Sequence, residues 1–136
     1  MMLKLTLSIG GVNMYTIGEV QALFDINAST IRYYEKEGIL LAIARNEMGR
    51  RIYSNEQINW LKLVIAMKDT GMSLKDIKVY VDLIMVGDDT LLERREFLVN
   101  HKKQVEEHLN QIHQNLEKII QKITYYDLKV LNKDYF

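Results

Sequence analysis

Three side chains of types that commonly bind DNA stand close together near position 30. Ser29, Arg32 and Tyr33 are spaced i, i+3 and i+4, so in a helix they share one face. Their hydroxyl, guanidinium and phenol groups suit hydrogen bonds to phosphate oxygens and to base edges. Ile31 and Tyr34 lie three residues apart on another, apolar face. The pattern favours a helix that packs through one face and reads DNA with the other. The alternative is an exposed cation beside two half-buried aromatic rings in an ordinary helical domain.

A second group of basic side chains follows in residues 42–53, a segment without helical periodicity. It holds Arg45, Arg50 and Arg51 against Glu47, so three positive charges minus one negative charge leave a local excess of +2. Guanidinium groups bind phosphate through paired hydrogen bonds. The segment therefore predicts a surface for the DNA backbone, with a solvated loop as the alternative.

The chain as a whole is electrically neutral. Its 136 residues contain 18 Lys and Arg and 18 Asp and Glu, so any attraction to nucleic acid must come from local charge. The absence of cysteine excludes disulfides, thiolate metal sites and cysteine nucleophiles. No apolar run approaches the roughly 18 residues that a membrane span needs, and residues 1–12 lack a signal-peptide cleavage site. We expect a cytoplasmic protein with no membrane partner, no cofactor and no metal site.

Capping signals predict the helices that hold the DNA-facing side chains. Thr16 and Glu19 form a capping box, which predicts a helix ending near Phe24. Asn27 is a favourable N-cap for a second helix over residues 28–37. A turn of about three residues between two short helices is typical of a helix-turn-helix, whose second helix enters the major groove.

The next elements are also indicated by turn and capping residues. Residues 46–49 are a turn candidate inside the segment 42–53, which predicts a short β-hairpin. Ser54 and Gln57 form a second capping box, and Ser73 begins a further helix.

The C-terminal third carries a coiled-coil pattern. From Val105 to Tyr126 the apolar residues recur in alternating steps of four and three. A helix over residues 90–126 would be about 55 Å long at 1.5 Å per residue, and the chain has no second long helix to cover its seam. We therefore predict a homodimer. The predicted dimerisation residues are Leu98, Val105, Leu109, Ile112, Leu116, Ile119 and Ile123.

These elements divide the chain into four parts. Residues 1–13 alternate like a strand but are expected to be an extension foreign to the fold, under the general rule that termini are poorly ordered. Residues 14–86 form the DNA-binding head and residues 87–126 the dimerisation helix. Residues 127–136 are predicted to be an apolar tail that packs back on another part of the protein.

Aromatic and methionine side chains could line an effector pocket where the head meets the coiled coil, or form ordinary core. These residues are Trp60, Met67, Tyr80, Tyr125 and Tyr126. Three histidines on the long helix could sense a metal or pH, but their spacing favours solvated flanks of the coiled coil.

Four blocks of sequence, in this order, resemble the head of MerR-family transcriptional regulators. They are residues 15–20, 29–40, 49–54 and 71–77. The resemblance implies a mainly α fold: a winged helix-turn-helix with a short β-hairpin wing, followed by a long helix that dimerises as an antiparallel coiled coil.

The resemblance also implies a function. Members of the family bind double-stranded promoter DNA as homodimers on an inverted repeat and act with RNA polymerase. They distort the promoter in response to a small-molecule effector or a stress signal. By match to the family, the DNA-binding residues are Thr16, Ser29, Thr30, Arg32, Tyr33, Arg45, Arg50, Arg51 and Tyr53.

Three features depart from the family pattern. Asp25 stands in the inter-helix turn where the family commonly has glycine, and Asp tolerates the left-handed conformation. Residues 40–42 lack the usual proline, so we expect a less rigid approach to the wing. The absence of cysteine excludes the metal-thiolate members and the thiol-sensing subgroup, whose short coiled-coil ending the chain otherwise resembles.

The sequence therefore predicts a dimeric DNA-binding regulator. The sequence shows no nucleophile paired with a general base and no phosphate-binding loop, so nothing in it indicates an enzyme. The alternative is a coiled-coil adaptor or small-molecule-sequestering protein without specific DNA binding, which the neutral charge favours.

Overall fold

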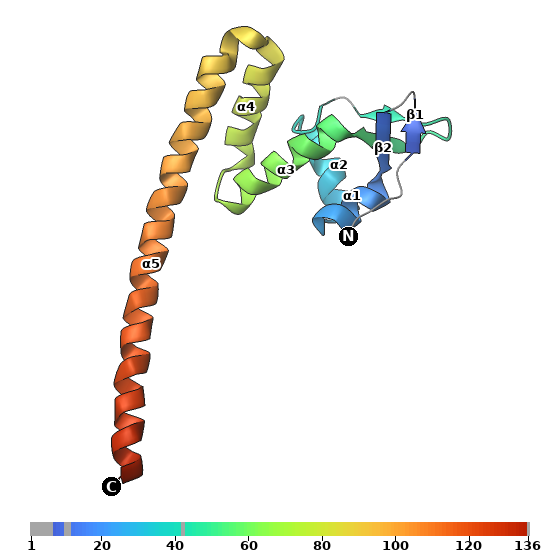
Figure 1. The fold of residues 1–136 in the computed structure, drawn as a ribbon. Coiled ribbons are helices and arrows are strands. Elements are labelled where there is room, and N and C mark those ends of the chain that lie inside the picture. Colours follow the sequence, from blue (N-terminus) through green and yellow to red (C-terminus); the bar gives the residue numbers. More distant parts are fainter. Residues whose placement is uncertain (1–6, 10–11, 42, 136) are drawn as a thin grey trace. The chain divides into compact units, whose positions relative to one another are not determined.

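The computed structural model describes residues 7–9, 12–41 and 43–135, and the chain divides into two compact units, Met1–Arg94 and Arg95–Phe136. The first unit contains a small sheet and four helices, and the second consists of most of the long helix α5 (Figure 1).

The head contains an antiparallel sheet of four strands, in the order β1-β2-β4-β3. The strands are β1 (Leu7–Ile9), β2 (Val12–Thr16), β3 (Ala44–Arg45) and β4 (Arg51–Ser54). β1 pairs with β2 along its whole length. The expectation that residues 1–13 are foreign to the fold is therefore wrong for residues 7–9, 12 and 13. The other residues of the extension lie outside the described ranges.

The helix-turn-helix forms as predicted. In α1 (Ile17–Phe24), the Thr16 hydroxyl accepts from the Glu19 backbone N–H, and the Glu19 carboxylate accepts from the Thr16 N–H. Asp25 then adopts the left-handed conformation with φ 53°, which turns the chain toward the next helix. α2 (Ala28–Lys36) begins after Asn27, although the Asn27 side chain makes no capping hydrogen bond.

The predicted β-hairpin is also confirmed, and Asn46 organises its tip. Its carboxamide oxygen accepts from the backbone N–H groups of Met48 and Arg50. Gly49 donates its N–H to the Asn46 carbonyl and has φ 77°, a conformation that favours glycine. The side chain of Asn46 thus closes a turn that has no Asn-Gly pair at its tip.

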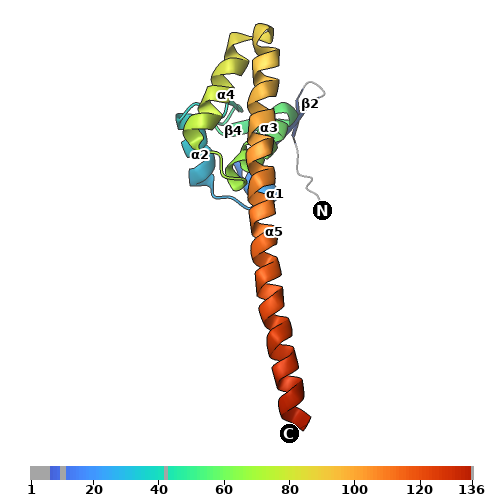
Figure 2. The same cartoon turned by 90° about the vertical axis from the view of Figure 1, so that its left-hand side faces the viewer.

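Helix α3 (Asn55–Asp69) packs on the sheet, and α4 (Leu74–Val86) packs against α3. α3 begins at the Ser54–Gln57 capping box, and it contacts β2, β4 and α4 (Figure 2). The rings of Trp60 and Tyr80 stack with centroids 5.8 Å apart, and the indole N–H donates to the Ile39 carbonyl at 2.7 Å. These contacts cover the largest aromatic residue of the head from two sides.

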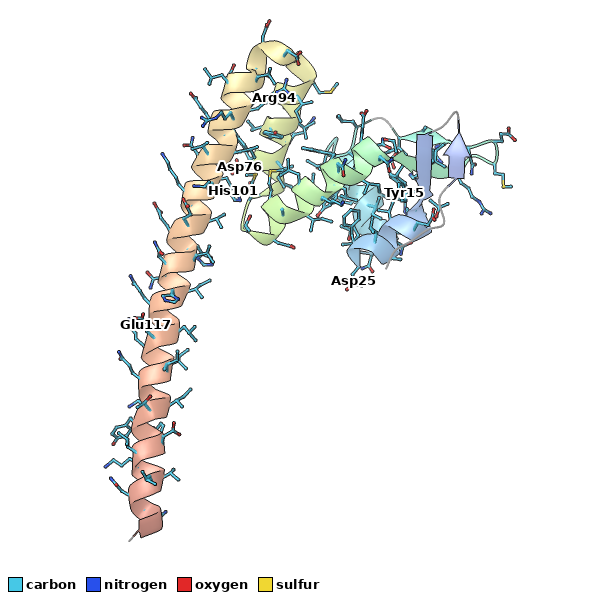
Figure 3. The ribbon with its side chains drawn as sticks, viewed as in Figure 1. Tyr15, Asp25, Asp76, Arg94, His101 and Glu117 are labelled. Atoms are coloured by element: carbon cyan, nitrogen blue, oxygen red, sulfur yellow. The ribbon has the colours of Figure 1, made fainter. Side chains whose placement is uncertain are left out.

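A short 3-10 turn, η1 (Asp88–Thr90), joins α4 to the start of α5. The buried Thr90 hydroxyl lies 2.6 Å from the Leu83 carbonyl and 2.8 Å from the Gly87 carbonyl. Arg94, labelled in Figure 3, donates to the Thr90 hydroxyl and to the Gly87 carbonyl. The junction therefore has its own polar network.

α5 (Leu91–Tyr135) is one helix of 45 residues. The expected end near Tyr126 is wrong, because residues 127–135 continue the helix instead of forming a tail that packs back. The seam positions from Leu109 to Tyr126 are about half exposed or more within this chain. Side chains project from α5 along its whole length (Figure 3).

Tyr53 of β4 lies opposite Tyr15 of β2 and is only 1% exposed. Its hydroxyl is buried and has no hydrogen-bond partner among the described residues. Burial is the main cause that raises the pKa of Tyr53. The Glu35 carboxylate raises it further, whereas the guanidinium groups of Arg32, Arg45 and Arg51 oppose the shift.

We expect the substitution Tyr53→Phe to leave the free energy of unfolding unchanged at neutral pH, or to raise it by up to about 1 kcal/mol, because it removes an unsatisfied buried hydroxyl. Above about pH 10 the unfolded chain's tyrosines ionise while the buried one stays protonated, so wild-type stability should fall as pH rises. The variant should fall less steeply in urea unfolding.

Tyr33→Phe is the matched control. It removes the same hydroxyl from a tyrosine that is 48% exposed and lies next to the buried Tyr34. The free energy of unfolding of Tyr33→Phe at neutral pH should stay within about 0.5 kcal/mol of the wild type, because Tyr33 is an exposed residue. A loss of more than about 1 kcal/mol in Tyr53→Phe at neutral pH would mean that the hydroxyl has a stabilising partner in solution.

Candidate nucleic-acid interface

A hollow of about 600 Å³ lies between the helix-turn-helix and the hairpin. Its wall combines the start of α1, one side chain of α2 and both sides of the hairpin. The lining residues are Thr16, Ile17, Gly18, Arg32, Arg45, Asn46, Met48, Gly49, Arg50 and Arg51. The fold thus brings together five predicted DNA-binding residues from three separate parts of the sequence.

The charged side chains that line this hollow are all positive. Four of its lining side chains are arginines, namely Arg32, Arg45, Arg50 and Arg51, and no carboxylate lines it among the described residues. The whole chain has a formal charge of zero, so four arginines around one hollow are a local excess of positive charge. We call these ten lining residues the arginine hollow.

Arg32 belongs to the exposed face of α2. Ser29, Arg32 and Tyr33 are exposed, while Ile31 and Tyr34 are buried, as their spacing predicted. Thr30 is half-buried. α2 therefore packs with its apolar face and leaves a hydroxyl, a guanidinium and a phenol free for a partner.

Two arginines of the hairpin are braced by neighbouring groups. A terminal nitrogen of Arg45, Nη1, donates to the Gly49 carbonyl at 2.7 Å. The Nε of Arg51 donates to Oε1 of Glu35 on α2 at 2.6 Å. Sequence reasoning missed Glu35, because the two partners are 16 residues apart and no local pattern joins them.

Tyr53 takes a different place from the other predicted contacts. Because its hydroxyl is covered, the residue supports the sheet from inside and presents no phenol at the surface. The prediction by match to the family that Tyr53 binds DNA stays a prediction, and in this arrangement the buried hydroxyl is not exposed to a partner.

The predicted effector residues fall into separate groups. Met67 and Tyr80 are buried in the head, whereas Trp60 lines a cavity of about 510 Å³. The other residues of that cavity are Met14, Leu41, Ala44, Ser54, Glu56, Gln57 and Ile84. On α5, the rings of Tyr125 and Tyr126 meet edge to face at 5.4 Å, with Lys122 over both rings.

Other kinds of site have little support among the described residues. No group of three or more His, Cys, Asp or Glu side chains in the described ranges could hold a metal ion. No helix in those ranges is long and apolar enough to cross a membrane. On the surface of α5, Nε2 of His113 lies 3.8 Å from Oε1 of Glu117, one turn along the helix.

Comparison with known proteins gives the same picture of the head. The family model described as "MerR HTH family regulatory protein" matches residues 15–83, about half of the chain. An uncharacterised HTH-type transcriptional regulator from Haemophilus influenzae is 42% identical over 80 residues, which are 59% of each protein. The regulator AdhR from Bacillus subtilis is 33% identical over 79 residues, 58% of this chain and 56% of AdhR. The chain therefore matches little more than half the length of these relatives.

Solved structures extend the likeness. HiNmlR, described as a MerR family regulator lacking the sensor domain and bound to promoter DNA, is 35% identical, with a TM-score of 0.77 over 84% of this chain and 90% of that one. A MerR family regulator from Bacillus thuringiensis is 37% identical, with a TM-score of 0.75 over 82% and 97%. On the family match, these relatives and the observed fold, the chain belongs to the MerR family of helix-turn-helix transcriptional regulators.

Proposed function

We propose that this protein binds promoter DNA through α2 and the arginine hollow and regulates transcription there. The observation that carries the proposal is the convergence of four arginines from α2 and the hairpin on one hollow of a neutral chain. The three hairpin arginines suit neighbouring phosphates of a duplex, and Arg32 stands beside them on α2.

The two surfaces of the head suit different parts of DNA. The exposed face of α2 offers Arg32 and Tyr33 to the major groove, where arginine pairs with two acceptors of guanine. The hairpin offers Arg45 and Arg50 to the phosphate backbone beside it. The similar protein HiNmlR, described as bound to promoter DNA, supports promoter DNA as the partner.

We further propose that two copies act together through α5. Its heptad positions from Leu109 to Ile123 are exposed in the single chain, so an apolar seam remains open to a second α5. An antiparallel pair would hold two heads at a fixed separation and match an inverted repeat. Bending the DNA between the heads costs on the order of 1–6 kcal/mol, which binding energy can supply. RNA polymerase would then meet a promoter of altered geometry.

We also propose the cavity at Trp60 as the site of a small-molecule effector. Its wall is mainly apolar, from Met14, Leu41, Trp60 and Ile84, with the Glu56 carboxylate among its polar groups. An aromatic compound with a hydrogen-bond donor or positive charge fits that lining. The alternative function, a coiled-coil adaptor that does not bind DNA specifically, leaves the arginine hollow without a role.

We expect Arg32→Ala to weaken specific binding to the promoter beside the gene by about 5- to 150-fold, because it removes a major-groove contact worth about 1–3 kcal/mol. Dimerisation should be unchanged. Fluorescence anisotropy over a salt series measures both the affinity and its salt dependence.

Lys62→Ala is the matched control, since Lys62 is an exposed cation on α3 outside the arginine hollow. It should bind DNA like the wild type. A wild-type protein with no affinity for any duplex at low salt would overturn the DNA-binding proposal and favour the adaptor.

We expect Leu116→Asp to dissociate the dimer and to weaken DNA binding in the same titration, because it places a charge in the middle of the seam. Sedimentation equilibrium measures the assembly state. Gln114→Asp adds the same charge two residues away, outside the apolar seam, and should remain dimeric. A dimeric Leu116→Asp would refute the heptad assignment.

We expect an effector found by thermal-shift screening to change the fluorescence of Trp60, the only tryptophan of the chain. Ile84→Glu should weaken its binding at least about tenfold, because it puts a charge in an apolar wall. Val79→Glu changes an exposed residue of the same helix and should bind normally. Unchanged binding to Ile84→Glu would place the effector elsewhere.

A further inference from the structure

The contact between Arg51 and Glu35 connects the two DNA-facing surfaces of the head. Arg51 belongs to strand β4 of the hairpin and Glu35 to the last turn of α2, and the Nε to Oε1 distance is 2.6 Å. The side chains are 25% and 28% exposed, so the ion pair lies at the edge of the surface, partly shielded from water. It is the only ion pair between the hairpin and α2 within the described residues.

The contact uses one specific nitrogen of the guanidinium. A guanidinium presents five N–H donors in a fixed planar fork. Glu35 takes the Nε donor, and the two terminal nitrogens of Arg51 make no hydrogen bond within the described part of the chain. Because the group is planar, fixing Nε also fixes the direction of the two terminal nitrogens, which belong to a side chain lining the arginine hollow.

We propose that Glu35 is a positioning residue for DNA binding, which holds the terminal nitrogens of Arg51 toward a phosphate and ties the hairpin to the recognition helix α2. This inference rests on the proposed function, because it assumes that the arginine hollow receives the DNA backbone. Arg51 contacts the phosphate and Glu35 acts only through Arg51.

The proposal predicts that removal of the negative charge of Glu35 lowers the affinity for DNA. A carboxylate next to a phosphate-binding surface repels DNA, so removal of Glu35 should raise affinity if its charge alone mattered. If Glu35 positions Arg51, its removal should lower affinity, because Arg51 must then lose side-chain freedom on binding. The direction of the change therefore separates the two roles.

Glu37 provides a matched control. It lies two residues after Glu35, is exposed, and its carboxylate makes no hydrogen bond or ion pair within the described residues. Glu37→Ala removes the same charge from nearly the same place without touching an arginine.

The experiment compares Glu35→Ala, Glu35→Gln and Glu37→Ala in the full-length chain, by anisotropy with a fluorescent duplex of its own promoter. We expect Glu35→Ala to lose about tenfold in affinity, within the coupling range of contacting residues. Glu35→Gln keeps an oxygen that accepts from Nε, so it should stay within about threefold of the wild type. Glu37→Ala should bind as tightly as the wild type or more tightly.

Two further variants test the path through Arg51. Arg51→Lys keeps the positive charge but loses the fork, so it should lose as much affinity as Glu35→Ala. In the Arg51→Ala background, Glu35→Ala should cause no further loss, since the group that it positions is absent.

Three results would overturn the proposal while the wild type still binds DNA. One is a gain in affinity in Glu35→Ala equal to that in Glu37→Ala. Another is a Glu35→Gln variant as weak as Glu35→Ala. The third is an additive loss in the double variant. A wild type that binds no DNA at low salt would overturn the proposed function as well. Circular dichroism melting checks that each variant is folded, and Glu35→Gln and Arg51→Lys keep the test open if Glu35→Ala unfolds.

Discussion

The antiparallel pairing of β2 with β4 is the contact on which the geometry of the head depends. β2 ends at Thr16, the N-cap of α1, and β4 ends at Ser54, the N-cap of α3. The pairing of Tyr15 with Tyr53 therefore fixes where both helices begin relative to one another. A shift of one residue would move Tyr53 to the opposite face of the sheet and carry Arg51 away from Glu35.

This arrangement explains why the head could be predicted largely from local signals. The partners in each capping box are three residues apart, so Thr16 with Glu19 and Ser54 with Gln57 are visible in the sequence itself. The contacts that join elements are not local. The ion pair of Arg51 with Glu35 and the pairing of β1 with β2 depend on how the sheet folds, and sequence reasoning found neither.

The C-terminal end of α5 lies nine residues beyond the end that the sequence predicts, at Tyr135 and not at Tyr126. The apolar residues after Tyr126 predict a tail, yet the chain contains no proline and its last glycine is Gly87. Without either stop signal the helix continues to Tyr135. Val130 also continues the heptad, seven residues after Ile123, so the seam pattern already indicated a longer helix. Apolar content alone therefore predicts a packed tail, whereas the absence of helix stops predicts a continued helix.

The arginine hollow also suggests how a neutral protein can bind a polyanion. Without a net positive charge there is little long-range attraction, so affinity must come from contacts made at short range. All four cations of the hollow are arginines, and Arg45 and Arg51 are already held by the Gly49 carbonyl and by Glu35. A braced side chain loses less conformational freedom when it meets a phosphate. Under the proposed function, the Gly49 carbonyl and the Glu35 carboxylate lower the entropic cost of binding phosphate through Arg45 and Arg51. This gain replaces part of the attraction that a net positive charge would supply.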